Sequence, residues 1–171
     1  MRGFDTAEYE ERVARTLILM KKNNLDLLVI TCPQNFRYYS GLDSYFWESP
    51  TRPWFLLLSI NHDPIAIIPS IGKTALENTW IKNIKIWQSP NPDDEGISAL
   101  KETILSINQS NYSVGFEMGN ESYLRMPIKD FENLKKQLAD YKFVDASHII
   151  WELRMIKSKK EIAKIKDITS I

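Results

Sequence analysis

The side chains best suited to chemistry in this sequence are two histidines, His62 and His148, and one cysteine, Cys32. Metal sites combine His, Cys, Asp or Glu at characteristic spacings, and neither histidine has such partners near it in the sequence. Cys32 follows a predicted strand, which suits a nucleophile, but its activation would need a histidine base that no motif supplies. We therefore predict no metal site and no complete catalytic set, with Cys32 as a small buried side chain.

Phosphate-binding loops are also missing. Residues 115–119 contain two glycines but lack the third glycine and the following helix of a dinucleotide loop, and there is no Walker lysine. Glu117 in this stretch could act as a lone acid, but we interpret it as a carboxylate at the end of a strand. A run of lysines near the C-terminal end alternates with isoleucines and is interpreted as the solvated face of a helix.

Residues 45–54 are the best functional candidate because they combine aromatic side chains, two prolines and an arginine. Aromatic and arginine side chains dominate interface hot spots, and Arg52 could bind a carboxylate through its planar fork. The candidate binding residues are Tyr45, Phe46, Trp47 and Arg52. The alternative is a lid folded on its own core, with Arg52 paired to Glu48.

Length and composition limit the possible classes of protein. The chain has 171 residues, of which 43% are hydrophobic, and 22 basic residues balance 22 acidic ones. A balanced charge predicts no binding to nucleic acid or to an acidic membrane surface. The single cysteine, the absence of a signal-peptide pattern and short apolar runs predict a soluble, cytoplasmic protein.

The elements that must position these residues alternate between helices and strands. Asp5 and Glu8 are spaced as a capping box for a helix that ends at residues 23–24. A buried strand over 25–30 follows, and then a hairpin of two strands, 55–60 and 64–68, in which Pro64 begins the second strand.

Further elements follow along the chain. They are a helix over 73–80, a strand over 84–87, a helix beginning at Pro92, a strand at 114–116, a helix beginning at Pro127, a strand at 143–144 and a helix over 147–156. This order predicts an α/β fold with a mixed sheet of about six strands flanked by helices. The family resemblance described below implies, in addition, ribonuclease H-like layering.

The last helix begins at a second capping box, Ser158 with Glu161, and carries isoleucines at helical spacing. No stop signal follows before residue 171. An apolar stripe with nothing left to pack on predicts that a C-terminal domain follows.

Four segments together resemble the N-terminal domain of the creatinase/prolidase/aminopeptidase P family, metal-dependent hydrolases with a pita-bread catalytic domain. Residues 35–41 resemble the family's Asn-x-x-Tyr-Leu-Thr-Gly signature, and residues 114–117 resemble its Ile-Gly-Val-Glu strand. Residues 143–146 and 153–162 resemble its Val-Asp-Ala and Leu-Arg-x-Ile-Lys-Ser-x-x-Glu-Ile junction. The matching motif residues are Asn35, Tyr38, Gly41, Asp145, Arg154, Lys157, Ser158 and Glu161. Gly41 would supply the turn after a short helix that Asn35 would cap.

The resemblance implies a division at residue 156. Residues 1–156 would form the N-terminal domain, and residues 157–171 would be the linker and first helix of a C-terminal catalytic domain. That domain would hold two divalent metal ions such as Mn, Co or Zn. The domain described here would be non-catalytic: it would mediate assembly into a homodimer or larger oligomer and shape a neighbouring subunit's substrate pocket, with Arg52 and the aromatics reaching the substrate.

The substrate class stays open between Xaa-Pro peptides and small amides or amidines, as in creatinase-like or ectoine-hydrolase-like enzymes. The absence of the family's Gly-Arg-Arg patch disfavours a plain prolyl peptidase. One alternative is a protein-interaction module whose pita-bread partner domain is degenerate. Another is a self-contained domain that binds a small molecule under the aromatic loop.

Overall fold

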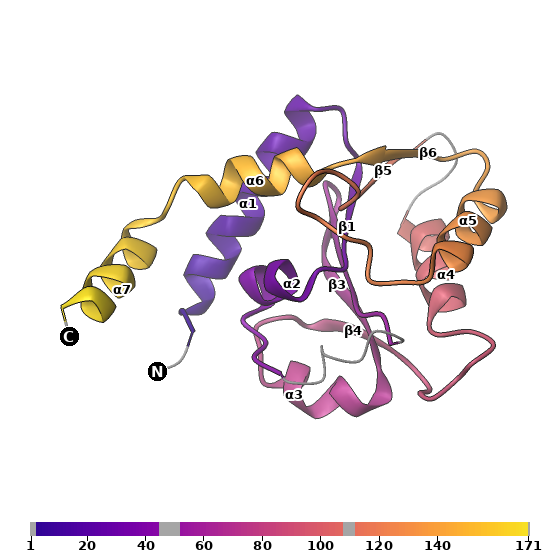
Figure 1. Ribbon diagram of the computed structural model, residues 1–171, viewed down its shortest axis with the longest axis horizontal. Coiled ribbons are helices and arrows are strands. Elements are labelled where there is room, and N and C mark those ends of the chain that lie inside the picture. Colours follow the sequence, from indigo (N-terminus) through magenta and orange to yellow (C-terminus); the bar gives the residue numbers. More distant parts are fainter. Residues whose placement is uncertain (1–2, 45–51, 108–111, 171) are drawn as a thin grey trace.

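A six-stranded mixed sheet forms the centre of the molecule (Figure 1). The computed structural model describes residues 3–44, 52–107 and 112–170. The strands are β1 (Leu27–Ile30), β2 (Phe55–Ser59), β3 (His62–Pro69), β4 (Asn83–Trp87), β5 (Ser113–Phe116) and β6 (Lys142–Asp145). Their order is β4-β3-β2-β1-β5-β6, with β1–β2 and β2–β3 antiparallel and the other pairs parallel.

Helices cover both faces of this sheet. They are α1 (Thr6–Lys22), α2 (Pro33–Ser40), α3 (Lys73–Glu77), α4 (Ile97–Ile107), α5 (Ile128–Gln137), α6 (Ser147–Met155) and α7 (Lys159–Thr169), with a 3-10 turn η2 (Ser70–Gly72) before α3. Figure 1 shows α1, α2 and α6 on one side of the sheet and α4 and α5 on the other. The predicted α/β fold with a mixed sheet of about six strands is confirmed.

Strand β1 lies between two hydrophobic cores because its side chains alternate between the two faces. Leu28 and Ile30 pack in the core under α1, α2 and α6, whereas Leu27 and Val29 pack in the core under α4 and α5. Each fully buried aliphatic side chain contributes about 1.5–3 kcal/mol to stability. This two-sided burial explains why the strand reads as a continuous apolar run rather than as an alternation.

Several predicted element boundaries are wrong. Pro64 is the third residue of β3 rather than the first, and it lies where the pairing with β2 shifts register, a place that tolerates a missing N–H. The helix predicted from Pro92 begins at Ile97 instead, after Gly96 with a φ of 83°. The predicted helix over 73–80 ends at Glu77.

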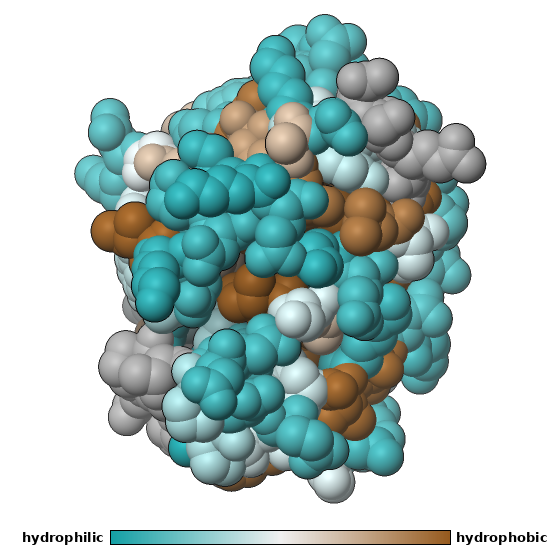
Figure 2. Space-filling view, turned by 90° about the vertical axis from the view of Figure 1, so that its right-hand side faces the viewer, coloured by the Kyte–Doolittle hydropathy of each residue, from teal (hydrophilic) through white to brown (hydrophobic). Residues whose placement is uncertain are grey.

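The side of the molecule formed by α4 and α5 has a broken apolar surface. Figure 2 shows hydrophobic residues there as separate spots among hydrophilic ones. Scattered apolar side chains of this kind are normal for a solvent-facing surface. No helix in the described part of the chain is long and apolar enough to cross a membrane.

Candidate functional site at the α6–α7 junction

A buried carboxylate joins the ends of the two central parallel strands. Because β1 and β5 run parallel, their carboxyl ends are adjacent, and Glu117 directly after β5 faces Thr31 and Cys32 directly after β1. Glu117 has no solvent exposure. It accepts hydrogen bonds from the backbone N–H groups of Thr31 at 2.6 Å and Cys32 at 2.8 Å. The interpretation of Glu117 as a strand-end carboxylate agrees with this position, and its hydrogen bonds give it a structural role.

Asn35 extends this contact to helix α6. Its Nδ2 donates to Glu117 Oε1 at 2.5 Å, and its Oδ1 accepts from Arg154 Nη1 at 2.5 Å. The prediction that Asn35 caps α2 is wrong. The N-cap residue is Cys32, whose side chain makes no capping hydrogen bond, and Asn35 is the third residue of the helix, with its amide toward Glu117. Three motif segments that are far apart in the sequence, 35–41, 114–117 and 153–162, therefore meet at the side-chain amide of Asn35.

A second polar cluster joins α1 to the start of α7. Arg12 donates from Nε to Glu8 Oε1 at 3.1 Å, and its Nη2 lies 3.2 Å from Glu161 Oε1. Ser158 Oγ donates to the same Glu8 oxygen at 2.8 Å. We name Glu8, Arg12, Ser158 and Glu161 the ionic latch. The capping box of Ser158 and Glu161 is confirmed.

Sequence reasoning missed two members of the ionic latch. Asp5 caps α1 as predicted, but the Glu8 side chain turns away from the cap toward Arg12 and Ser158, so the first capping box is only half formed. The available signal was the (i, i+4) spacing of Glu8 and Arg12, which is common on solvated helix faces. Both side chains are only 3% exposed, and no sequence pattern indicated that burial.

Tyr38 and Gly41 line the same region. The Arg12 guanidinium lies 4.1 Å from the centre of the Tyr38 ring and donates to the Tyr38 carbonyl at 2.7 Å. Burial raises the pKa of Tyr38, and the negative charge of Glu161 adds to the shift. Gly41 ends α2 with a φ of 75°, as predicted, and a side chain there would collide with the ring of Tyr9.

Two further motif residues hold the ends of α6. Asp145 Oδ1 accepts from the hydroxyl and the N–H of Ser147 and from the N–H of Met118. Partial burial alone would raise the pKa of Asp145, but these hydrogen bonds outweigh it and lower the pKa below its usual value. At the other end, Lys157 Nζ donates to the carbonyl of Arg154. Asp145 therefore ties the start of α6 to the segment after β5, and Lys157 caps carbonyls at the end of the helix.

The structure describes only part of the predicted substrate-binding segment, residues 45–54. Tyr45, Phe46 and Trp47 lie outside the described residues. Arg52 is half-buried and forms no hydrogen bond or ion pair with another described residue. The structure therefore leaves the binding role of these four residues as a prediction.

The two histidines and the single cysteine lie apart from one another. His62, at the start of β3, and His148, on α6, are both exposed. The Cys32 thiol is buried and donates to Gln34 Oε1; burial, followed by the nearby charge of Glu117, raises its pKa. Within residues 3–44, 52–107 and 112–170, no three His, Cys, Asp or Glu side chains gather where they could hold a metal ion.

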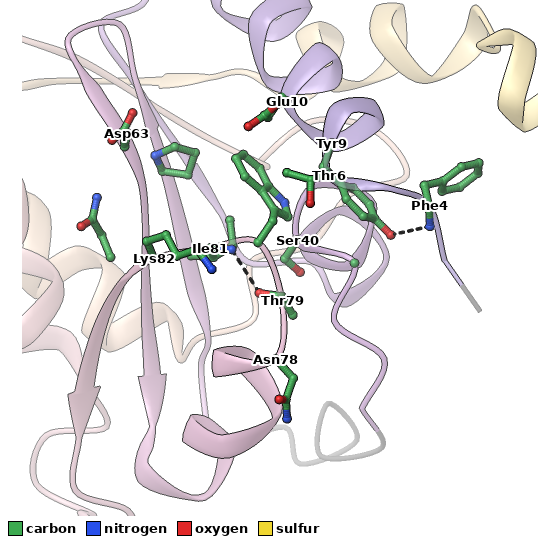
Figure 3. Close-up of a pocket in the computed structure, with 14 residues that line it drawn as sticks. Phe4, Thr6, Tyr9, Glu10, Ser40, Asp63, Asn78, Thr79, Ile81 and Lys82 are labelled. Atoms are coloured by element: carbon green, nitrogen blue, oxygen red, sulfur yellow. Dashed lines mark hydrogen bonds between the residues drawn. The ribbon is translucent and has the colours of Figure 1, made fainter. Parts of the chain in front are cut away.

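A surface hollow lies beside the N-terminal part of α1. It measures about 570 Å³ and lies between the start of α1, the end of α2 and the β3–β4 edge (Figure 3). Trp80 forms part of its wall, held by a hydrogen bond to the Tyr39 carbonyl. Its charged side chains, Glu10, Asp63 and Lys82, are exposed rather than buried. It has the size of a ligand pocket but lacks the convergent buried polar groups that fix a ligand.

The surface formed by α6, α7 and the residues between them carries several exposed apolar side chains. Exposed fractions reach 65% for Met155 and 72% for Ile168. The exposed apolar residues of this face, named the junction face, are Trp151, Met155, Ile156, Ile162, Ile165 and Ile168. Polar contacts thus hold the start of α7 to α1, while the apolar residues of the junction face stay exposed.

Comparison with known proteins identifies the family. A family model described as the Creatinase/Prolidase N-terminal domain matches residues 12–156. The chain therefore belongs to the creatinase/prolidase N-terminal domain family, which confirms the resemblance drawn from its motifs.

Relatives and solved structures agree with this assignment. An uncharacterised hydrolase/peptidase of Sinorhizobium fredii is 29% identical over 170 residues, covering 96% of this chain and 42% of that protein. Ectoine hydrolase of Halomonas elongata is 28% identical over 166 residues, covering 93% and 40%. The crystal structure of a prolidase from Thermococcus sibiricus has the same fold, with a TM-score of 0.73 at 22% identity, covering 91% and 39%. The chain spans about two fifths of the length of these proteins.

Proposed function

We propose that this chain is the non-catalytic N-terminal domain of a metal-dependent hydrolase that cleaves an amide or amidine bond. The junction face is the observation that carries this proposal. Helix α7 lies outside residues 12–156, the part that matches the family domain, and none of its residues is buried. An apolar stripe in that position suits a partner domain of the same polypeptide, in which α7 is the first helix and residue 157 begins the linker.

The catalytic metal ions would then belong to the C-terminal domain. Two divalent ions such as Mn, Co or Zn would activate a water and stabilise the oxyanion there. The described residues offer no cluster of metal ligands, which is compatible with this division of roles. The present domain would support assembly into a homodimer or larger oligomer and would shape the substrate pocket of a neighbouring subunit, with Arg52, Tyr45, Phe46 and Trp47 near the substrate.

The relatives favour two substrate classes without separating them. One relative is an ectoine hydrolase, and one structural neighbour is a prolidase. The alternative function is a protein-interaction module attached to a degenerate pita-bread domain. The ordered match to hydrolases favours the enzyme, and the presence of two Asp, one His and two Glu in the polypeptide beyond this domain would decide between them.

The non-catalytic role is tested by titrating the 171-residue chain with MnCl₂ in a calorimeter and by incubating it with glycyl-proline and Mn²⁺. We expect no saturable heat and no release of proline, because the metal ligands are supplied elsewhere. Stoichiometric Mn²⁺ binding, or proline release above the rate of a heat-denatured sample, would contradict the proposal.

A further inference from the structure

Helix α7 contacts the rest of the domain through polar atoms. None of its residues is buried, and its isoleucines at positions 162, 165 and 168 are 42%, 49% and 72% exposed. Its contacts to α1 are the bond of Ser158 to Glu8, the ion pair of Glu161 with Arg12, and the pair of Lys160 with Asp5 at 2.7 Å. The position of α7 therefore depends on these few interactions rather than on a hydrophobic interface.

Arg12 is the most enclosed member of this set. It is 3% exposed, and its guanidinium lies over the rings of Phe4 at 4.3 Å and Tyr38 at 4.1 Å. Because Glu8 and the Tyr38 carbonyl each accept one of its N–H groups, the guanidinium is held in one orientation. Its Nη2 then faces Glu161, so that α1 presents a preformed binding site for the first turn of α7.

The exposed pair of Lys160 and Asp5 contributes much less. The two side chains are 48% and 61% exposed, and solvent screens such surface pairs so that they add little stability. An isolated helix of eleven residues is marginal in water. A stable α7 therefore requires the buried part of the contact.

We propose that Arg12, through the ionic latch, fixes helix α7 in one direction on the domain and so presents the isoleucines of the junction face to the domain that follows. The identity of that partner rests on the proposed function, whereas the latch itself does not. Arg12 is thus a positioning residue for the connection between the two domains.

Hydrogen–deuterium exchange on the 171-residue chain tests this proposal. Glu161→Gln removes one charge of the ion pair, while its amide oxygen can still cap the N–H of Ser158. We expect the amides of residues 162–169 to exchange at least about tenfold faster in this variant, with the amides of β1 and β2 unchanged. The matched control, Lys160→Met, removes the exposed pair on the same helix and should accelerate exchange by less than about threefold.

A second variant distinguishes loss of the ionic latch from a general folding defect. Arg12→Met alone leaves the buried Glu8 without its partner, so Glu8→Gln is combined with it to remove both charges. The double variant should also release α7 while β1 and β2 stay protected. Unchanged exchange of α7 in both variants, or an α7 that already exchanges at the unstructured rate in the wild type, would overturn the proposal.

These outcomes can be told apart from failure of the proposed function. The exchange measurement uses neither metal nor substrate, so it reports on the latch even if the chain never forms part of a hydrolase. If α7 exchanges as expected but the chain itself binds Mn²⁺ and releases proline, the inference about the ionic latch is supported and the proposed function is contradicted.

Discussion

At the scale of single residues, the buried carboxylate of Glu117 explains why three distant motifs belong together. Backbone groups at the end of β1 need acceptors because the strand has ended and solvent is excluded. Glu117 supplies them, Asn35 completes the set, and Arg154 places a positive charge behind the amide. These residues therefore hold α2 and α6 on the central strands.

The role of Glu117 predicts a large loss of stability on truncation. Glu117→Ala leaves the N–H groups of Thr31 and Cys32 buried without acceptors, which should lower the free energy of unfolding by about 3 kcal/mol or more. Glu117→Gln keeps one acceptor and should lower it less. Urea denaturation followed by circular dichroism measures both.

Glu102→Ala is the control for this comparison because Glu102 is an exposed glutamate on α4. It should change the stability by less than about 0.5 kcal/mol. Equal stabilities of the Ala variants at positions 117 and 102 would show that the buried hydrogen bonds do not support the fold.

At the scale of elements, the hydrogen bonds of Asp145 anchor the start of α6. The pKa of Asp145 lies below that of an unfolded Asp, about 3.9. The ionised Asp145 carboxylate therefore contributes its full stabilisation above the pKa that Asp145 has in the unfolded chain. This stabilisation is lost as the pH falls through the lower pKa that Asp145 has in the folded protein. The stability difference between the wild type and Asp145→Asn should accordingly be larger at pH 6 than at pH 3.

Urea denaturation at the two pH values measures this difference. The variant removes the titrating group but keeps one acceptor oxygen, so the two proteins should converge in acid. A difference that grows on acidification would mean that the carboxylate does not carry the anchoring bonds.

The elements that sequence patterns predicted well are those with strong local signals. The cap at Asp5, the glycine that ends α2 and the capping box at Ser158 each act within one turn of helix, and all three are present. The errors at Pro64 and Pro92 arise where tertiary contacts decide: a register shift between strands and the left-handed Gly96. Local propensity cannot anticipate such contacts.

The candidate site was harder to predict than the fold. Its key members, Glu8, Arg12 and Glu117, are charged residues whose importance comes from burial, and burial depends on which distant segments pack over them. The family resemblance pointed to Asn35, Arg154 and Glu161, but only the structure shows that these residues belong to two separate clusters, one around Glu117 and one around Arg12.

At the scale of the whole molecule, the two clusters and the junction face have complementary roles. The clusters hold α6 and α7 to the sheet and to α1, and the apolar residues of the junction face stay exposed among charged ones such as Lys159 and Lys166. The α4–α5 side shows only separate apolar spots (Figure 2). Under the proposed function, the junction face is where the partner domain would pack.

The central claim is tested most directly by a chimera of this chain with ectoine hydrolase from Halomonas elongata, in which residues 1–171 replace the matched segment of the relative. We expect the chimera to hydrolyse ectoine when Mn²⁺ is added. A chimera in which Ile162, Ile165 and Ile168 are all changed to Ser should lose that activity. The same three changes in the isolated chain should leave its fold intact. A chimera that folds with an intact C-terminal domain yet shows no hydrolysis, or one whose activity is indifferent to the three serines, would contradict the account.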